Sequence, residues 1–566
     1  MVPENKSLSE TTNSTNFDEN LDESLIQQNN LTKPEPKIFL RLFKKRKVVS
    51  EDQNEVSMAL VNYKNKLKHL EEHYDIHVND IMPDLLHRGD IVSPQRMLGY
   101  VDAMMATCAT FLVIPLRKIK DISPNHFLGD HLYENRTEFI MFLLGYLVVL
   151  TIWESINIRS LLIKRVDDIL LFMTMFTMFL TSLLPFSLSL EGHYPGETIS
   201  VWITCSLLAL IELTDLCVLF YSMEHPSVLH VELHTWTKAE RRRFRNMLCL
   251  QNIFNIVFFI MGSLFILLNH VLAWVFIAMI ILMPPFKKLF FYVRRHTISQ
   301  TKIEKSPFFF HFTKGNISIE RVTAMSDAAF AIIACILILD ITIDEFPTYQ
   351  NVLNHGLTYE LMHMKKDFFI YFGIFAIISI LWYSNHGVLH LFKSTNVIIV
   401  YLQKISLALA CLTPLAGNMV VVYATNQNRD AKKSILVTSL VIFFSSTFNL
   451  IILIYGLYTK EKYLHCWAVG NMKKNKYQQI YTVLKASNFP FWSFLCTLGS
   501  RMPVSVIFYI MCGCFCCSIA TFIGLKLIFD RLIGKKKFLL RKITDPKIPK
   551  NSEDIPTNSE NAKNED

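Results

Sequence analysis

Apolar residues recur along this chain in windows of about 20 residues, separated by short polar or basic connections. A helix of about 20 residues is long enough to cross the roughly 30 Å of hydrocarbon in a bilayer. The pattern therefore predicts an all-α, polytopic membrane protein with twelve transmembrane helices. The predicted spans are 96–116, 137–158, 169–191, 199–221, 247–269, 271–292, 321–343, 367–389, 397–423, 434–457, 480–499 and 503–530. The eleventh has the weakest apolar pattern, because Lys485 and Pro490 lie inside it.

These twelve spans form two copies of one six-helix unit. Four pairs of residues mark the repeat: Arg96 and Arg321, Asp102 and Asp327, Trp153 and Trp382, and Pro185 and Pro414. The first two pairs are 225 residues apart and the last two are 229 apart. The extra four residues must lie between the first and second spans of the second copy, where a loop absorbs an insertion more easily than a helix does. An even number of spans per copy gives both copies the same orientation, so the repeats are parallel.

Four regions follow from this organisation. We expect a partly disordered cytosolic N-terminal region at 1–95, transmembrane repeat I with a basic connection at 96–320, transmembrane repeat II at 321–532, and a polar cytosolic tail at 533–566. Lys and Arg cluster after the even-numbered spans, which predicts that both termini are cytosolic. Asn135, in the sequence Asn135-Arg136-Thr137, is then the glycosylation candidate on the far side of the membrane.

Composition agrees with a membrane protein and excludes other classes. Of the 566 residues, 51% are hydrophobic and 19% are charged, with the charge concentrated toward the ends, unlike the surface of a soluble domain. The net charge of +9 lies beside the apolar spans, where it sets orientation and meets anionic membrane lipids, so it does not indicate nucleic acid. Most of the twelve cysteines lie in predicted helices and fit no disulfide framework. Those at Cys512, Cys514, Cys516 and Cys517 are typical of packing, with metal binding as the alternative, and we expect no metal or cofactor.

The first span of each copy carries an Asp six residues after its Arg. Asp102 and Asp327 are costly inside a membrane, so a functional or fold-fixing role with polar partners is the default interpretation. The second span of each copy ends on the same side of the membrane, and brings its Trp toward that acid. We therefore expect a buried polar cluster between the first two helices of each copy, with these partners: Trp153 and Asn157, and Trp382 and His386.

A stripe of small and weakly polar residues runs along the same two helices, about 100° away from the acids. Its members are Ala103, Thr107, Thr110 and Ile114 in the first copy and Ala328, Ile332, Cys335 and Leu339 in the second. Such a stripe is typical of a close-packing face, with a pore lining as the alternative. Two further acids, Glu212 and Asp215 in the fourth span, have no acidic counterpart in the second copy. We interpret them as partner-satisfied buried acids, with a proton path as the alternative.

The segment Arg321-Val-Thr-Ala-Met-Ser-Asp327 resembles the RxxxFSD signature of the endolysosomal TMEM175 potassium channels, and the segment from Arg96 to Asp102 looks like a degenerate first copy. The likeness covers roughly residues 96–532. It implies a homodimeric cation channel of endosome and lysosome membranes, permeable to potassium with protons as a possible second ion, and without catalytic turnover. Its pore would be lined by the first helix of all four repeats.

The resemblance also implies site residues by position. The hydrophobic constriction falls at Thr107 and Ile332, where the family has Ile, and the layer that favours potassium falls at Thr110 and Cys335, where the family has Thr. The signature network comprises Arg96, Asp102, Arg321, Ser326 and Asp327, and Asp340 is the candidate for luminal pH sensing. A neck with Thr in place of Ile is wetter, which predicts a leakier pore or a constriction moved to Met104 or Phe111.

Two other functions compete with a channel. A proton-coupled secondary transporter would use Asp102 or Asp327 for coupling. A lipid-modifying enzyme would need a His/Asp or Ser/His constellation at one membrane face, and the sequence offers none with convincing spacing.

Overall fold

The computed structural model describes residues 92–116, 128–234, 236–297, 309, 312–313, 315–343, 346–424, 430–459, 462–465, 468 and 476–544. Most of the predicted N-terminal region and the end of the polar tail lie outside these residues. Within these residues, the side chains of Asp340 and of further positions, including 295–297, 476–478 and 533–544, are not described. No strand occurs among the described residues, so the predicted all-α class is confirmed.

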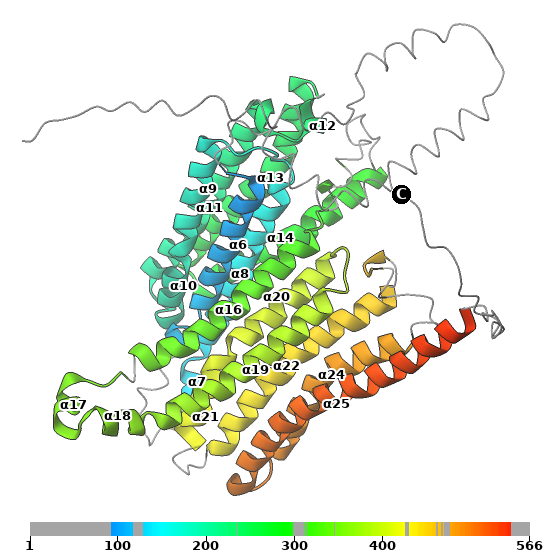
Figure 1. The fold of residues 1–566 in the computed structure, drawn as a ribbon. Helices are drawn as coiled ribbons and strands as arrows, with labels where there is room; N and C mark the ends of the chain where they lie inside the picture. The colour runs from blue at the N-terminus through cyan, green and yellow to red at the C-terminus, as the bar shows by residue number, and fades with distance from the viewer. Residues whose placement is uncertain are drawn as a thin grey trace, which may run out of the picture. The chain divides into compact units, whose positions relative to one another are not determined.

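Helices lie at every predicted span (Figure 1). In the first repeat they are α6 (Pro94–Phe111), α7 (Leu128–Glu134), α8 (Arg136–Ser160), α9 (Asp168–Ser182), α10 (Leu184–His193), α11 (Thr198–Glu224), η2 (Pro226–Val228), α12 (Val231–His234), α13 (Lys238–Phe265) and α14 (His270–Thr297). In the second they are α16 (Ile319–Ile343), α17 (Tyr349–His355), α18 (Leu357–His363), α19 (Lys365–Leu389), α20 (Val397–Cys411), α21 (Thr413–Ala424), α22 (Ala431–Thr459), α24 (Lys476–Gly499) and α25 (Val504–Thr544).

Within the described residues, ten stretches are long and apolar enough to cross a membrane. Helices α6 and α24, at the first and eleventh predicted spans, are not among these ten. The polytopic class is therefore confirmed. A helix lies at each of the twelve predicted spans, but only ten of these spans in the described residues also meet the length and hydropathy expected of a membrane crossing. Helix α25 also continues to Thr544, beyond the predicted end of the last span.

Both repeats break their third span at the same place. Helix α9 ends before Leu183 and α10 resumes with Pro185 in its first turn. Helix α20 ends before Leu412, and α21 resumes with Pro414 as its second residue. Proline has no backbone N–H and its ring clashes with the preceding turn, so each break follows from the proline that also marks the repeat.

A second feature repeats outside the helices. In each repeat, a residue in the loop after the second span forms an isolated antiparallel bridge with a residue in the loop after the fourth. The bridges join Ile163 to Leu229 in the first repeat and Phe392 to Leu464 in the second. Ile163 and Phe392 are 229 residues apart, the same offset as the tryptophans and prolines. The two copies therefore share a backbone arrangement in their loops as well as in their helices.

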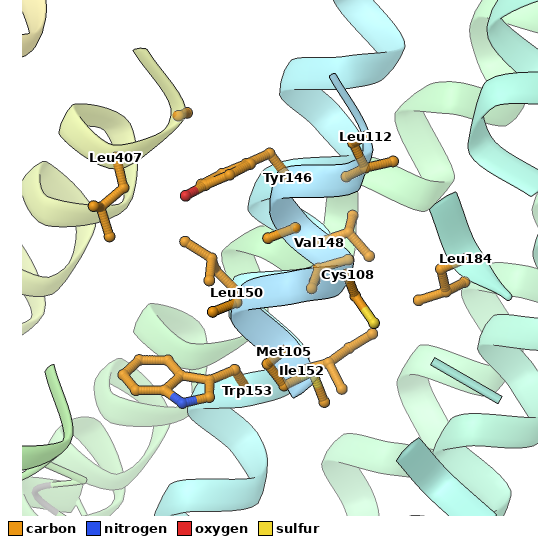
Figure 2. Close-up of a cluster of buried hydrophobic side chains, with 14 of the residues drawn as sticks. Met105, Cys108, Leu112, Tyr146, Val148, Leu150, Ile152, Trp153, Leu184 and Leu407 are labelled. Carbon is orange, nitrogen blue, oxygen red and sulfur yellow. The ribbon is translucent and has the colours of Figure 1, made fainter. Parts of the chain in front are cut away.

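The two repeats meet along their first helices. Helix α6 packs against α16, and α8 packs against α20. Figure 2 shows the apolar core on the first-repeat side, where Cys108 of α6 and Leu112 just after it lie near Tyr146 of α8, with Leu407 of α20 across from them. Tyr146 is fully buried. This core fixes α6 between α8 and the second repeat, which positions the signature residues described next.

Candidate functional site

Asp102 is a buried acid with both carboxylate oxygens occupied. The Trp153 indole N–H donates to Oδ1 at 2.7 Å, and the Arg321 guanidinium donates to Oδ2 at 2.8 Å. Only 3% of the Asp102 side chain is exposed. The predicted polar cluster between the first two helices is therefore present. It also includes an arginine from the other repeat, which the sequence did not indicate.

Asp327, the equivalent acid of the second repeat, has a more open environment. Trp382 donates its indole N–H to Oδ1 at 2.8 Å, and His386 Nδ1 lies 3.8 Å from the same oxygen. The Asp327 side chain is 40% exposed, and among the described residues no arginine pairs with it. The Trp–Asp contact thus repeats, whereas the Arg–Asp contact of Asp102 has no equivalent within one copy of the chain.

The remaining signature residues lie apart from these acids. Arg96 is exposed at the start of α6, and its backbone N–H donates to the Ser93 hydroxyl at 3.4 Å. Ser326 is fully buried and accepts a hydrogen bond from the Gln403 side-chain amide at 3.0 Å. Gln403 also donates to Asn385 Oδ1 at 2.8 Å, so Ser326 belongs to a separate buried polar group that joins α16, α19 and α20.

The stripe residues differ between the repeats. Thr107 and Ile332 are both half-buried. Thr110 is fully buried, and its hydroxyl lies 2.9 Å from the carbonyl oxygen of Ala106 in its own helix. Cys335, at the equivalent position, is exposed. The two constriction candidates, Thr107 and Ile332, are therefore buried to a similar extent. The two selectivity candidates differ, because Thr110 is buried and Cys335 is exposed.

This difference extends along both helices in a complementary way. On one face, Ala106 and Thr110 of α6 and Val113 just after it are buried. The equivalent residues of α16 are exposed, namely Ala331, Cys335 and Ile338. On the adjacent face the opposite holds, with the residues of α16 buried and those of α6 exposed. Met325 and Ile336 of α16 are buried, whereas their equivalents Tyr100 and Phe111 of α6 are 46% and 41% exposed.

A buried ion pair between the repeats was missed by the sequence reasoning. Lys404 of α20 places Nζ 2.7 Å from Glu154 Oε2 and 3.4 Å from the Thr151 hydroxyl of α8. The lysine side chain is 3% exposed and the glutamate 1%. A signal was available, because each is an unpartnered charge inside an apolar span, and such charges are expected to pair with one another.

The acids of the fourth span are satisfied, as interpreted from the sequence. Asn255 of α13 donates its side-chain N–H to Glu212 Oε1 at 2.8 Å. Asp215 forms an ion pair with Arg159, at the end of α8. Asn135 precedes α8 and is half-buried, with its side-chain nitrogen 2.9 Å from the His131 ring. Asp340 lies in α16, but its side chain is outside the described residues.

The two tryptophans offer a matched test of this site. Replacing Trp153 by phenylalanine is expected to lower the free energy of unfolding by about 1–3 kcal/mol, because it leaves a buried oxygen of Asp102 without its donor. Trp382→Phe should cost less, because water can reach the half-exposed Asp327. Thermal unfolding of the purified variants, in detergent at a dilution that keeps single copies apart, measures both. Equal losses in that monomeric form would contradict the difference in burial between Asp102 and Asp327 within one copy.

Comparison with known proteins finds one family in both repeats. A sequence model described as "Endosomal/lysosomal potassium channel TMEM175" matches residues 96–185 and 321–414, the first three predicted spans of each copy. Relatives named "Endosomal/lysosomal proton channel TMEM175" are 26% identical in Danio rerio (66% of this chain, 72% of the relative), 25% in Gallus gallus (66% and 75%) and 26% in Homo sapiens (63% and 71%). The resemblance of this chain to the TMEM175 family is thereby confirmed in both repeats.

Proposed function

We propose that two copies of this chain form a cation channel of endosomal and lysosomal membranes, with α6 and α16 of both copies around one pore. The relatives are named as channels of these compartments, which supports the class and the location. Potassium and protons are the proposed ions, because the family model and the relatives name one each. Both termini face the cytosol in this proposal, and the repeats occupy 96–320 and 321–532 between the cytosolic regions 1–95 and 533–566.

The complementary burial of α6 and α16 carries this proposal. Inside one copy, each helix hides the face that its repeat equivalent leaves exposed. A second copy related by a two-fold axis would bring the exposed face of α16, with Cys335 and Ile338, onto the exposed face of its α6, with Tyr100 and Phe111. The four helices then alternate around the axis, and each makes the contact that α6 and α16 make within one copy.

The same argument supplies partners for the signature residues. Arg321 and Asp102 pair within one copy, so the equivalent pair is Arg96 and Asp327, 225 residues away in each case. Both of these side chains are exposed or half-exposed in one copy. We propose that Arg96 of one copy pairs with Asp327 of the other, which completes the signature network across the dimer.

The pore of this dimer would be lined by residues whose side chains are at least partly exposed at equivalent positions of both repeats. Ala103 is exposed and Ala328, Thr107 and Ile332 are half-buried. Two Thr107 and two Ile332 side chains would form the constriction, which is less apolar than four isoleucines and so dewets less readily. Thr110 and Cys335 remain the proposed selectivity layer. The Thr110 hydroxyl is engaged with its own helix, and the Cys335 face, exposed in one copy, would lie beside α6 of the second copy. Asp340 remains the proposed luminal pH sensor.

Substituting Thr107 by isoleucine is expected to lower basal current, because it restores an apolar ring that closes by dewetting. Patch recording measures this current, with Ile332→Thr as the opposite change that should raise it. Passive current that reverses near the potassium potential supports the proposal. Its absence would defeat the channel, and uphill potassium flux driven by a proton gradient would favour a secondary transporter.

A further inference from the structure

Two lysines of α14 lie among charged side chains at the end of the first repeat. Lys287 and Lys288 are half-buried, and the charges around them come from α8 and α20. The Lys287 ammonium lies 5.5 Å from the centre of the Phe312 ring. The Lys288 side chain packs beside Gly315, where a larger residue would place its Cβ 3.2 Å from Lys288 Cε.

The carboxylates nearby are already paired with other cations. Glu154 contacts Lys404 at 2.7 Å, and Asp215 forms its ion pair with Arg159. Within the described residues, neither Lys287 nor Lys288 has a carboxylate within ion-pair distance. Counting the described side chains alone, this basic cluster holds two ammonium groups in excess of its carboxylates, and a partly buried charge without a counter-ion is costly.

The two lysines lie toward the basic end of α14, where lipid headgroups are expected. Lys287 and Lys288 follow directly on the apolar run of α14 that ends at Phe286, and Lys288 lies six residues, or about 9 Å along the helix, before Arg294. The charge pattern of the sequence assigns this end to the cytosolic side. Lysine side chains extend toward the interface with their apolar stems in the membrane, so both ammonium groups can reach the headgroup layer.

We infer that the site formed by Lys287 and Lys288 of α14, beside α8, Phe312 and Gly315, binds the phosphate monoester of an anionic membrane lipid. A phosphate monoester carries about −1.5 to −2 charges near neutral pH, which matches two ammonium groups. A zwitterionic headgroup has no net charge to offer. Basic pockets between transmembrane helices on the cytosolic side are suited to such headgroups.

Purified full-length protein in detergent tests this site. Dioctanoyl phosphatidic acid should raise the thermal unfolding midpoint in a saturable way, whereas dioctanoyl phosphatidylcholine should not. The variant Lys287→Gln/Lys288→Gln should weaken phosphatidic acid binding on the order of tenfold or more, because two charges are removed. The matched control is Arg242→Gln/Arg243→Gln, which removes the same charge from exposed positions on α13 and should bind within about twofold of the unmodified protein.

Other outcomes would overturn the inference. Unchanged phosphatidic acid binding in the lysine variant, or an equal loss of binding in the arginine control, would mean that the lipid binds by general charge attraction and not at Lys287 and Lys288. Inorganic phosphate that stabilises as well as phosphatidic acid would assign the site to a soluble anion, and phosphatidylserine of equal affinity would remove the preference for a monoester. If the double variant does not fold, the single variants Lys287→Gln and Lys288→Gln apply the same test, with a several-fold loss expected from each.

Discussion

Replacing Lys404 by methionine is expected to lower the free energy of unfolding by about 3–5 kcal/mol. Glu154 would keep its charge in an environment where only 1% of its side chain is exposed, and its 2.7 Å contact with the ammonium group would be lost. Removing one partner of a buried ion pair is costly because the remaining charge is left without compensation. The loss should also loosen the junction between the repeats, since α8 and α20 carry one partner each.

Two controls separate charge from packing. Glu154→Gln/Lys404→Met removes both charges and should recover most of the stability, because apolar or neutral replacements of a buried pair are often tolerated. Lys433→Met breaks the 2.9 Å contact with Asp430. The Lys433 side chain is 56% exposed, and the buried Asp430 keeps its 2.7 Å hydrogen bond from the Leu128 backbone N–H, so a smaller loss of about 1 kcal/mol is expected. Thermal unfolding in detergent measures all three. Equal losses in the single and double variants at Glu154 and Lys404 would mean that the lysine contributes through packing rather than charge.

Arg96→Asp is expected to separate the proposed dimer and to abolish its current. The substitution places two acids opposite each other if Arg96 meets Asp327 of the second copy, and lost or reversed interface charge pairs cost about 2–5 kcal/mol or more. That range corresponds to at least roughly thirtyfold in the dimer dissociation constant. The mass of the detergent-solubilised complex, measured by light scattering, reports the change directly.

The reciprocal swap makes this test specific. Arg96→Asp/Asp327→Arg restores opposite charges across the proposed interface and should recover the dimer in part. Arg136→Asp reverses an exposed charge at the start of α8, away from that interface, and should leave the mass unchanged. A dimer that survives Arg96→Asp intact, or a swap that recovers nothing, would contradict the alternating order of α6 and α16 around the axis.

The apolar pattern was sufficient for the helices, because span length in a bilayer is set by hydrocarbon thickness and backbone hydrogen bonding rather than by the neighbours of a helix. The predicted spans coincide with helices in both repeats. The break in each third span could also have been predicted, since Pro185 and Pro414 stand alone in otherwise apolar stretches.

The contacts of Asp102 and Asp327 could be predicted only in part from the sequence. The Trp–Asp contacts followed from spacing, because the first two helices of one repeat are neighbours in the chain and end on the same side of the membrane. Arg321 lies in the same helix as Asp327, but it contacts Asp102 of the other repeat. An arginine side chain is long enough to reach a neighbouring helix, and sequence spacing carries no information about which one that is.

By itself the sequence determined the membrane class, the internal repeat, and an acid and a tryptophan at the same positions in each copy, because helix length and periodicity are local properties of the chain. Only the tertiary structure decided how the two copies differ. Thr110 is buried and Cys335 is exposed, although they occupy equivalent positions. Lys404 forms an ion pair with Glu154, which lies 250 residues away in the sequence. The physical reason is that burial and ion pairing depend on which helix lies alongside, and two equivalent helices of one copy cannot have the same neighbours on both faces.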